Sequence, residues 1–147
     1  MNVSAINVYP IKSLRGDSLE EALICSNGLE HDRRWMLVDR ESRMITQREC
    51  TSLAIISAHA GQDGLRIAAP DGREISVPHD TSSWTNDEVV VDVWGRSYVG
   101  VAAVSPINQA ISEMIGMNCR LLSIRADVFR VKRDVAFHDD SPVLIIK

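Results

Sequence analysis

The sequence has 147 residues, which fits one ordinary domain and excludes a large multi-domain assembly within this chain. Hydrophobic residues make up 45% and charged residues 24%, and no apolar run reaches the ~18 residues that a transmembrane helix needs. The net charge of -4 disfavours general binding to nucleic acid or to an acidic membrane surface.

Short strands are expected throughout the first half of the chain. Residues 3–8 are apolar and β-branched and stop before Pro10, which cannot donate to a central ladder. Residues 19–24 lead into a turn at 26–28, where Asn27 and Gly28 tolerate positive φ. Residues 35–39 and 44–46 are predicted to form a hairpin around a loop at 40–43, and residues 53–57 a further strand.

The second half contains the clearest local signals. Pro70-Asp71-Gly72 separates predicted strands at 65–69 and 74–77, because Asp-Gly suits the tight turns of hairpins. Residues 89–94 alternate, so that Val89, Val91 and Val93 share one face. A turn at 95–97 then leads into a strand at 98–101.

One helix is predicted over residues 105–115. Ser105 is expected to cap it, Pro106 suits its first position, and Gly116 stops it. Its apolar residues recur at helical spacing and are expected to pack on the sheet: Ile107, Ala110, Ile111, Met114 and Ile115. Strands are predicted again at 121–124 and at 142–147. The fold class is therefore mainly β: a β-barrel-like α+β fold of short antiparallel strands with one principal helix.

Polar loop residues after strands are the candidates for ligand contacts. Lys12 and Ser13 follow the first strand, and a point charge beside a short hydroxyl donor suits phosphate. Arg33 precedes the strand at 35–39 and offers a planar fork to the same anion, with Asp32 beside it to orient it. Thr46-Gln47-Arg48 forms a third polar triplet after a strand, with Thr46 and Arg48 as further candidates. Ordinary loop salt bridges explain all of these residues equally well at this point.

Histidines and cysteines give no metal pattern. His31, His59, His79 and His138 lie far apart and are expected to be single surface residues. Cys25, Cys50 and Cys119 match neither a disulfide framework nor a zinc spacing, and isolated thiols suit a reducing compartment. The first residues lack a basic start followed by an apolar core, so no signal peptide is expected and the chain is predicted to be cytoplasmic.

The order of several motifs is more specific than any one of them. YPIKS, SNGLEHDRRWMLVD and ITQRE, followed by VDVWG, PINQAISEMIG, CRLL and FRVKRDVAFHDDSPVLIIK, resemble the N-terminal β-barrel domain of MOSC-family proteins. That family includes bacterial MOSC proteins and the mitochondrial amidoxime-reducing component. The resemblance covers essentially the whole chain, with residues 1–125 as the N-terminal β-barrel domain. Residues 126–147 would be a connecting segment and the first strand of a truncated MOSC domain proper.

The resemblance implies a molybdenum cofactor, or molybdopterin, in the full-length family context. Residue by residue, it places Lys12, Ser13 and Arg33 at the phosphate of the pterin. The molybdenum ligand would be a cysteine of the second domain, expected beyond Lys147, and none of the three cysteines here matches it. We therefore expect no metal ligand, no catalytic residue and no tightly bound cofactor in this chain. Family membership also implies molybdenum-ion binding, pyridoxal phosphate binding and oxidoreductase activity.

Two functions stay open from the sequence. In the first, the chain contributes pterin-phosphate contacts to an oxidoreductase or sulfur-handling enzyme and is inactive alone. In the second, it is a non-enzymatic module that binds an anion, a pterin or a protein. The expected partners are a pterin or phosphate-bearing small molecule and a redox partner protein, with neither nucleic acid nor membrane.

Overall fold

The structure, a computed structural model, describes residues 3–25 and 28–124. Short strands dominate, and one α-helix lies near the end of the described chain. The strands are β1 (Ile6–Val8), β2 (Asp17–Leu19), β3 (Ile24–Cys25), β4 (Gly28–Leu29), β5 (Trp35–Val38), β6 (Ser57–Gly61), β7 (Gly64–Ala68), β8 (Glu74–Pro78), β9 (Trp84–Val93), β10 (Arg96–Ala103) and β11 (Arg120–Ile124). The helix is α1 (Ser105–Ile115), and the 3-10 turns are η1 (Thr51–Ala54) and η2 (Thr81–Ser83).

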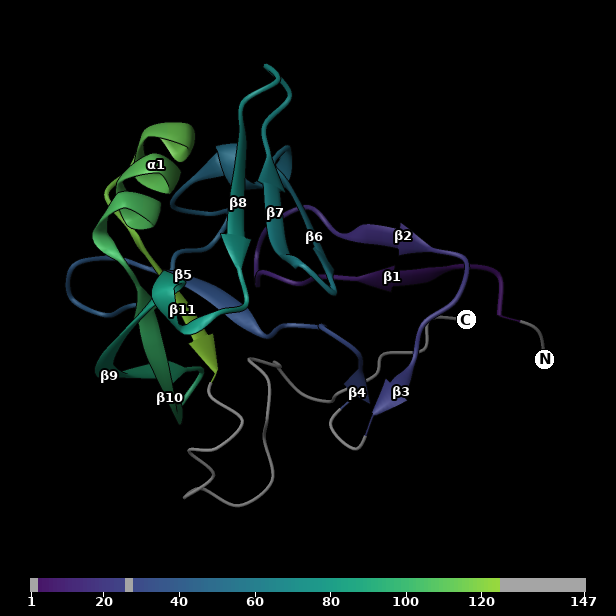
Figure 1. The fold of residues 1–147 in the computed structure, drawn as a ribbon, viewed down its shortest axis with the longest axis horizontal. Helices are drawn as coiled ribbons and strands as arrows, with labels where there is room; N and C mark the ends of the chain where they lie inside the picture. The colour runs from purple at the N-terminus through teal and green to yellow at the C-terminus, as the bar shows by residue number, and fades with distance from the viewer. Residues whose placement is uncertain (1–2, 26–27, 125–147) are drawn as a thin grey trace.

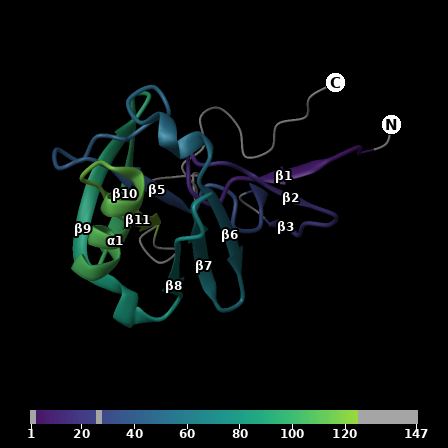
Figure 2. The same ribbon diagram turned by 90° about the horizontal axis from the view of Figure 1, so that it is seen from above.

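The strands pair into antiparallel sheets. The largest has four strands in the order β5-β11-β10-β9, and a second contains β6-β7-β8. Two small ladders, β1 with β2 and β3 with β4, extend to one side of the molecule (Figures 1 and 2). The prediction of a mainly β, antiparallel fold with one principal helix is confirmed. Within the described residues the sheets form a barrel-like arrangement rather than one closed barrel.

The core lies on both faces of the four-stranded sheet. All four residues of β5 are buried, with Trp35 and Leu37 in one apolar cluster and Met36 and Val38 in the other. The first cluster fills the space between this sheet, the β6-β7-β8 sheet and α1. The second contains the buried face of β9, namely Val89, Val91 and Val93. The alternation predicted for this strand is therefore confirmed, because Val90 and Asp92 are exposed.

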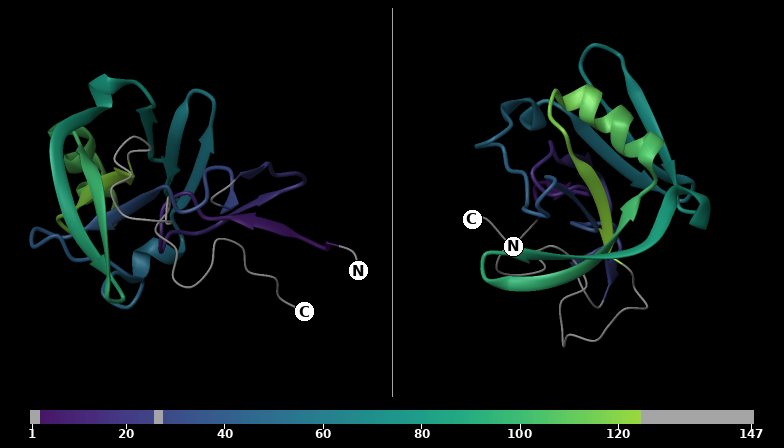
Figure 3. Two further views of the ribbon diagram at one scale, coloured as in Figure 1. Left: turned by 90° about the horizontal axis from the view of Figure 1, so that it is seen from below. Right: turned by 90° about the vertical axis from the view of Figure 1, so that its left-hand side faces the viewer.

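The helix has the predicted bounds, with one correction at its start. The N-cap is Val104, which makes no side-chain capping bond, so Ser105 is the first helical residue rather than the cap. Gly116 ends the helix at φ +75°, which glycine adopts without strain. Ile111, Met114 and Ile115 are buried, and α1 packs against β11 and β8 (Figure 3).

Three strand predictions fail, in part or entirely. Residues 53–57 were expected as a strand, but η1 and the turn that follows it occupy most of that range, and β6 begins at Ser57. Residues 19–24 do not form one strand, because the extended residues belong to β2 and β3 with a gap between them. The return at 44–46 is reduced to a bridge between Val38 and Met44. In each case tertiary contacts override the local propensity for extended backbone.

Two further expectations concern the C-terminal segment and membrane-spanning helices. The predicted connecting segment at 126–147, with its strand at 142–147, lies outside the described residues. Among residues 3–25 and 28–124, none of the helices has both the length and the apolar character required to cross a bilayer.

Candidate functional site

The loop after β1 lies directly against the segment that leads into β5. The amide of Arg33 donates to the carbonyl oxygen of Tyr9 (2.9 Å), and the amide of Trp35 donates to that of Pro10 (3.1 Å). In return, the amide of Lys12 donates to the carbonyl oxygen of Trp35 (2.9 Å). Two segments that are far apart in the sequence are therefore joined as a short parallel ladder, and the backbones that carry Lys12 and Arg33 are brought together.

Asp32 fastens this junction from inside. Its side chain is 1% exposed, and one carboxylate oxygen accepts the amide of Tyr9 at 2.8 Å. The other oxygen pairs with Nη1 of Arg33. The Arg33 guanidinium also lies 5.1 Å from the centre of the Tyr9 ring, within the range of a cation–π contact. The sequence predicted Asp32 as the neighbour that orients Arg33, and the ion pair between the two side chains agrees with that expectation.

The three predicted anion-binding residues differ in exposure. Lys12 is 7% exposed, Ser13 is half-buried, and the side chain of Arg33 is 26% exposed. Ser13 and Arg33 both have positive φ, at +72° and +49°, which is uncommon outside glycine. Such backbone persists only where surrounding contacts hold it. One of those contacts is made by Gln47, whose side-chain amide donates to the carbonyl oxygen of Ser13 at 2.8 Å.

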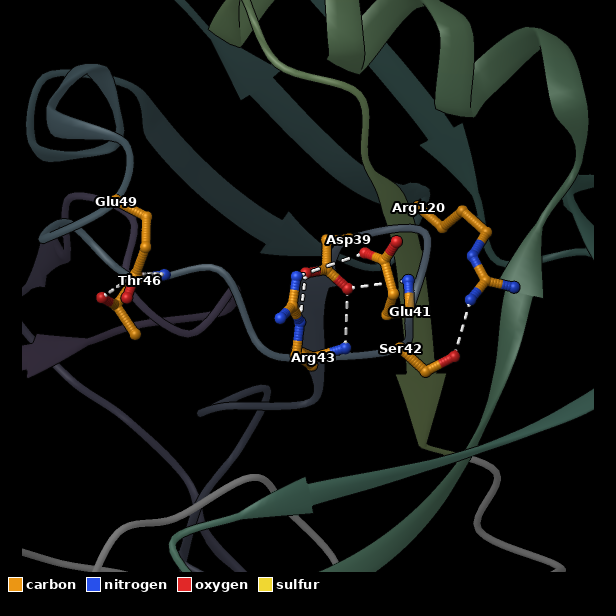
Figure 4. A network of polar contacts seen from close by, with 7 residues as sticks. All are labelled: Asp39, Glu41, Ser42, Arg43, Thr46, Glu49 and Arg120. Carbon is orange, nitrogen blue, oxygen red and sulfur yellow. Dashed lines mark hydrogen bonds and ion pairs between the residues drawn. The ribbon is translucent and has the colours of Figure 1, made fainter.

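Gln47 connects the predicted polar triplet at 46–48 to the Lys12–Ser13 loop. The sequence pointed to Thr46 and Arg48 of this triplet as cofactor candidates, whereas the bond to the carbonyl oxygen of Ser13 comes from Gln47. Thr46 is used within its own turn, where its hydroxyl and amide both bond to the Glu49 carboxylate (Figure 4). The side chain of Arg48 is exposed. No pattern within five residues identifies Gln47, because its partner is 34 positions away.

The hairpin after β5 holds a second polar network, shown in Figure 4. The carboxylate of Asp39 accepts the amides of Glu41 and Arg43, each at 2.9 Å, and Nε of Arg43 at 2.8 Å. Partial burial opposes ionisation, but these bonds hold the pKa of Asp39 below its usual value. Arg120 of β11 reaches the same hairpin through a 2.8 Å bond from Nη2 to the Ser42 hydroxyl. This network orders the turn around residues 39–43 and is structural.

The expectation of single surface histidines holds in part, because His59 and His79 are exposed, whereas His31 and His79 lie together. The rings of His31 and His79 stack on each other at 6.0 Å and each lies near the Trp35 ring, at 6.2 and 5.9 Å. His59 pairs with Asp17. Burial lowers the pKa of His31. These groups nevertheless form no metal cluster, since no set of three ligating side chains converges within the described residues. His138 lies outside them.

All three cysteines are free thiols. Cys50 and Cys119 are buried in the first apolar cluster, and Cys25 is half-buried. Burial raises the pKa of the Cys119 thiol, which makes it a poor nucleophile. Cys50 and Cys119 therefore act as small apolar core residues.

A cleft beside this junction has the wrong charge for an anion. It has a volume of about 530 Å³ and is lined by the carboxylates of Asp17, Glu21 and Glu30, together with Pro10 and His31. Carboxylates repel phosphate, so this cleft does not suit an anion.

Comparison with known proteins identifies the family to which this sequence belongs. The profile of the MOSC N-terminal beta barrel domain matches residues 1–118. Mitochondrial amidoxime-reducing component 1 of Mus musculus is 30% identical, over 98% of this chain and 47% of its own length, and the Homo sapiens protein is 28% identical over the same shares. Molybdenum cofactor sulfurase of Drosophila melanogaster is 30% identical over 75% of this chain and 15% of its own length.

The fold comparison agrees. A solution structure of a Bordetella bronchiseptica protein superimposes with a TM-score of 0.59 at 20% identity, covering 90% of this chain and 97% of that one. At this identity the likeness concerns the fold alone. The chain spans about half the length of the amidoxime-reducing components it matches. Because the profile covers most of the sequence, this chain belongs to the family defined by the MOSC N-terminal beta barrel domain.

Proposed function

We propose that this chain holds the pterin phosphate of a molybdenum cofactor through Lys12, Ser13 and Arg33. The observation that carries the proposal is the ladder between the Tyr9–Lys12 loop and the Arg33–Trp35 segment, which joins the backbones of both predicted cations. The relatives named above include a molybdenum cofactor sulfurase, whose name concerns the molybdenum cofactor, and an amidoxime-reducing component, whose name concerns a reduction.

The donors at this junction fit a phosphate. A phosphate dianion needs positive charge and several hydrogen-bond donors, preferably where water is partly excluded. Lys12 supplies a nearly buried ammonium, and Ser13 adds a hydroxyl. Arg33 carries five N–H donors, and only Nη1 is engaged by Asp32, so donors remain for an anion on a side chain that solvent reaches.

The cofactor would supply the redox or sulfur chemistry, and the protein residues would supply position. Within the proposal, Lys12 and Arg33 neutralise the phosphate, and Asp32 sets the rotamer of Arg33. The hydroxyl of the half-buried Ser13 donates a hydrogen bond to the same anion. The chain contributes this binding to an oxidoreductase or sulfur-handling enzyme and has no turnover alone. A redox partner protein and a cytoplasmic location belong to the same proposal.

A phosphate titration followed by backbone amide shifts tests the binding residues. Affinity for inorganic phosphate should be about millimolar, or about 4 kcal/mol, because the loop is open to screening by salt. Arg33→Ala should weaken binding more than Arg33→Lys, since lysine keeps the charge but loses the fork. Arg66→Ala, which removes an exposed arginine of β7, is the matched control and should bind as the parent does.

Two results would contradict the proposal. The first is a titration in which the amides of Ser13 and Arg33 do not move while amides elsewhere do. The second is stoichiometric molybdenum with reductase turnover in the purified chain, which would overturn its inactivity alone. Pyridoxal phosphate binding stays a prediction, and the same titration with that ligand tests it.

A further inference from the structure

β9 is the edge strand of the four-stranded sheet. Its residues pair with β10 on one side, and no described residue pairs with it on the other. The strand lies at the outer margin of the molecule in Figures 1 and 2. Its ladder with β10 is regular from Glu88 to Val93 and becomes irregular before that point. The regular part is about 17 Å long, which is enough for a short partner strand.

The register shows which backbone groups point outward. Val93 and Arg96 flank a two-residue turn, Trp94-Gly95, in which both residues have positive φ. Such a turn closes on a hydrogen-bonded pair, and hydrogen-bonded pairs then alternate along an antiparallel ladder. Val93, Val91 and Val89 therefore bond to β10. The residues between them, Glu88, Val90 and Asp92, direct their N–H and C=O groups to the free edge.

The same three residues present their side chains to solvent. Val90 is 64% exposed, and Glu88 and Asp92 are exposed on either side of it. Trp94 at the turn is 63% exposed. An incoming strand would therefore meet two carboxylates with an apolar residue between them, on one face and at alternate positions. This pattern calls for basic, apolar and basic side chains at alternate positions of the partner.

Charge argues against a second copy of the chain as that partner. If β9 paired with itself about a two-fold axis at Val90, Glu88 of each copy would lie directly opposite Asp92 of the other. Like charges opposite each other destabilise a strand pair, and charged edges protect natural sheets from self-association. The carboxylates that oppose self-pairing attract a basic strand.

We propose that the edge of β9 from Glu88 to Val93 docks an extended, basic segment of a partner protein, which adds to the sheet as a fifth strand. The backbone groups of Glu88, Val90 and Asp92 provide the hydrogen bonds. The carboxylates of Glu88 and Asp92 select lysine or arginine, and Val90 selects an apolar residue between them. This surface is independent of the phosphate-binding loop.

The test uses the full chain and a synthetic peptide as the probe. The peptide is threonine-lysine-threonine-valine-threonine-lysine-threonine with blocked ends, and the control peptide has glutamate in place of lysine. The amides of Glu88, Val90 and Asp92 should shift and exchange more slowly with deuterium when the basic peptide is added. The acidic peptide should leave them unchanged. Equal effects of both peptides, or no effect of either, would overturn the proposal.

Variants separate the contribution of side-chain charge to peptide binding from that of the backbone hydrogen bonds. Glu88→Lys should weaken binding of the basic peptide roughly three- to tenfold, because an attraction becomes a repulsion at an exposed site. Val90→Pro removes an outward N–H that β10 does not use, and should abolish binding while the remaining amide spectrum stays folded. Asp63→Lys makes the same charge change on the turn between β6 and β7 and should bind as the parent does.

Hydrogen exchange without peptide tests whether the β9 edge is already occupied in the free chain. Exchange of the same three amides should be fast without peptide and should not depend on protein concentration. Protection that grows with concentration would identify a second copy as the occupant and would refute the partner strand. Unchanged affinity in both Glu88→Lys and Val90→Pro would place binding elsewhere and refute it as well.

Discussion

Replacing Asp32 should expose how much the junction between the two loops contributes to stability. In Asp32→Ala the amide of Tyr9 loses a charged acceptor at 2.8 Å. A hydrogen bond to a charged group contributes about 1.5–3 kcal/mol. The lost ion pair adds less than about 1 kcal/mol, because the side chain of Arg33 is 26% exposed and solvent screens it. The expected cost is therefore about 2–4 kcal/mol.

Asp32→Asn separates these two contributions. The asparagine oxygen can still accept the amide of Tyr9, whereas the ion pair with Arg33 is lost, so the expected cost is about 1–2 kcal/mol. Asp63→Ala is the control, because this exposed carboxylate makes no hydrogen bond or ion pair within the described part of the chain. Its effect should stay within about 0.5 kcal/mol.

Urea unfolding followed by fluorescence measures all three variants. With a slope of about 2 kcal/mol/M, a loss of about 3 kcal/mol lowers the midpoint by about 1.5 M. An Asp32→Ala midpoint within about 0.3 M of the parent would show that the Asp32 contacts do not hold the loops together. An asparagine variant as unstable as the alanine variant would instead assign the effect to the lost charge.

Three further expectations follow from burial, backbone conformation and titration. Ile111→Ala should cost roughly 2–5 kcal/mol in urea unfolding, because Ile111 is 1% exposed within the first apolar cluster; a cost below about 1 kcal/mol would contradict that packing. Gly64→Ala should cost roughly 2–4 kcal/mol, because its Cβ would lie 2.4 Å from the carbonyl oxygen of Val77 at φ +141°. Gly72→Ala, at φ +90° with open space around it, should cost only about 1 kcal/mol, and equal costs would rule out the clash. Burial lowers the pKa of His31 from 6.5, so the unfolded chain binds the proton more tightly and stability should fall as pH drops below that value. His31→Asn, which tolerates the positive φ of this residue, should flatten the difference in unfolding free energy between about pH 7 and about pH 5, and an unchanged difference would assign it to other groups.

Local sequence is sufficient to predict the elements that depend on neighbouring residues. The helix has the predicted bounds, because Pro106, the apolar spacing and Gly116 all act within a few residues of one another. The β7–β8 hairpin follows from Pro70-Asp71-Gly72 in the same way. The two faces of β9 follow from simple alternation of side chains. The order of the motifs also predicted the family correctly, because a set of short matches at consistent distances is specific even when each match is weak.

Which segments lie next to each other in space depends on tertiary packing. Residues 53–57 have strand propensity, yet Leu53 is buried in the core from within the 3-10 turn η1, and the strand begins only at Ser57. Asp32 bonds to Tyr9 across 23 positions, and Gln47 bonds to Ser13 across 34. The stack of His31, Trp35 and His79 likewise joins separate segments. Local patterns report backbone propensity and the face of a side chain, whereas these pairings depend on how the sheets pack, which is set by the burial of the whole core.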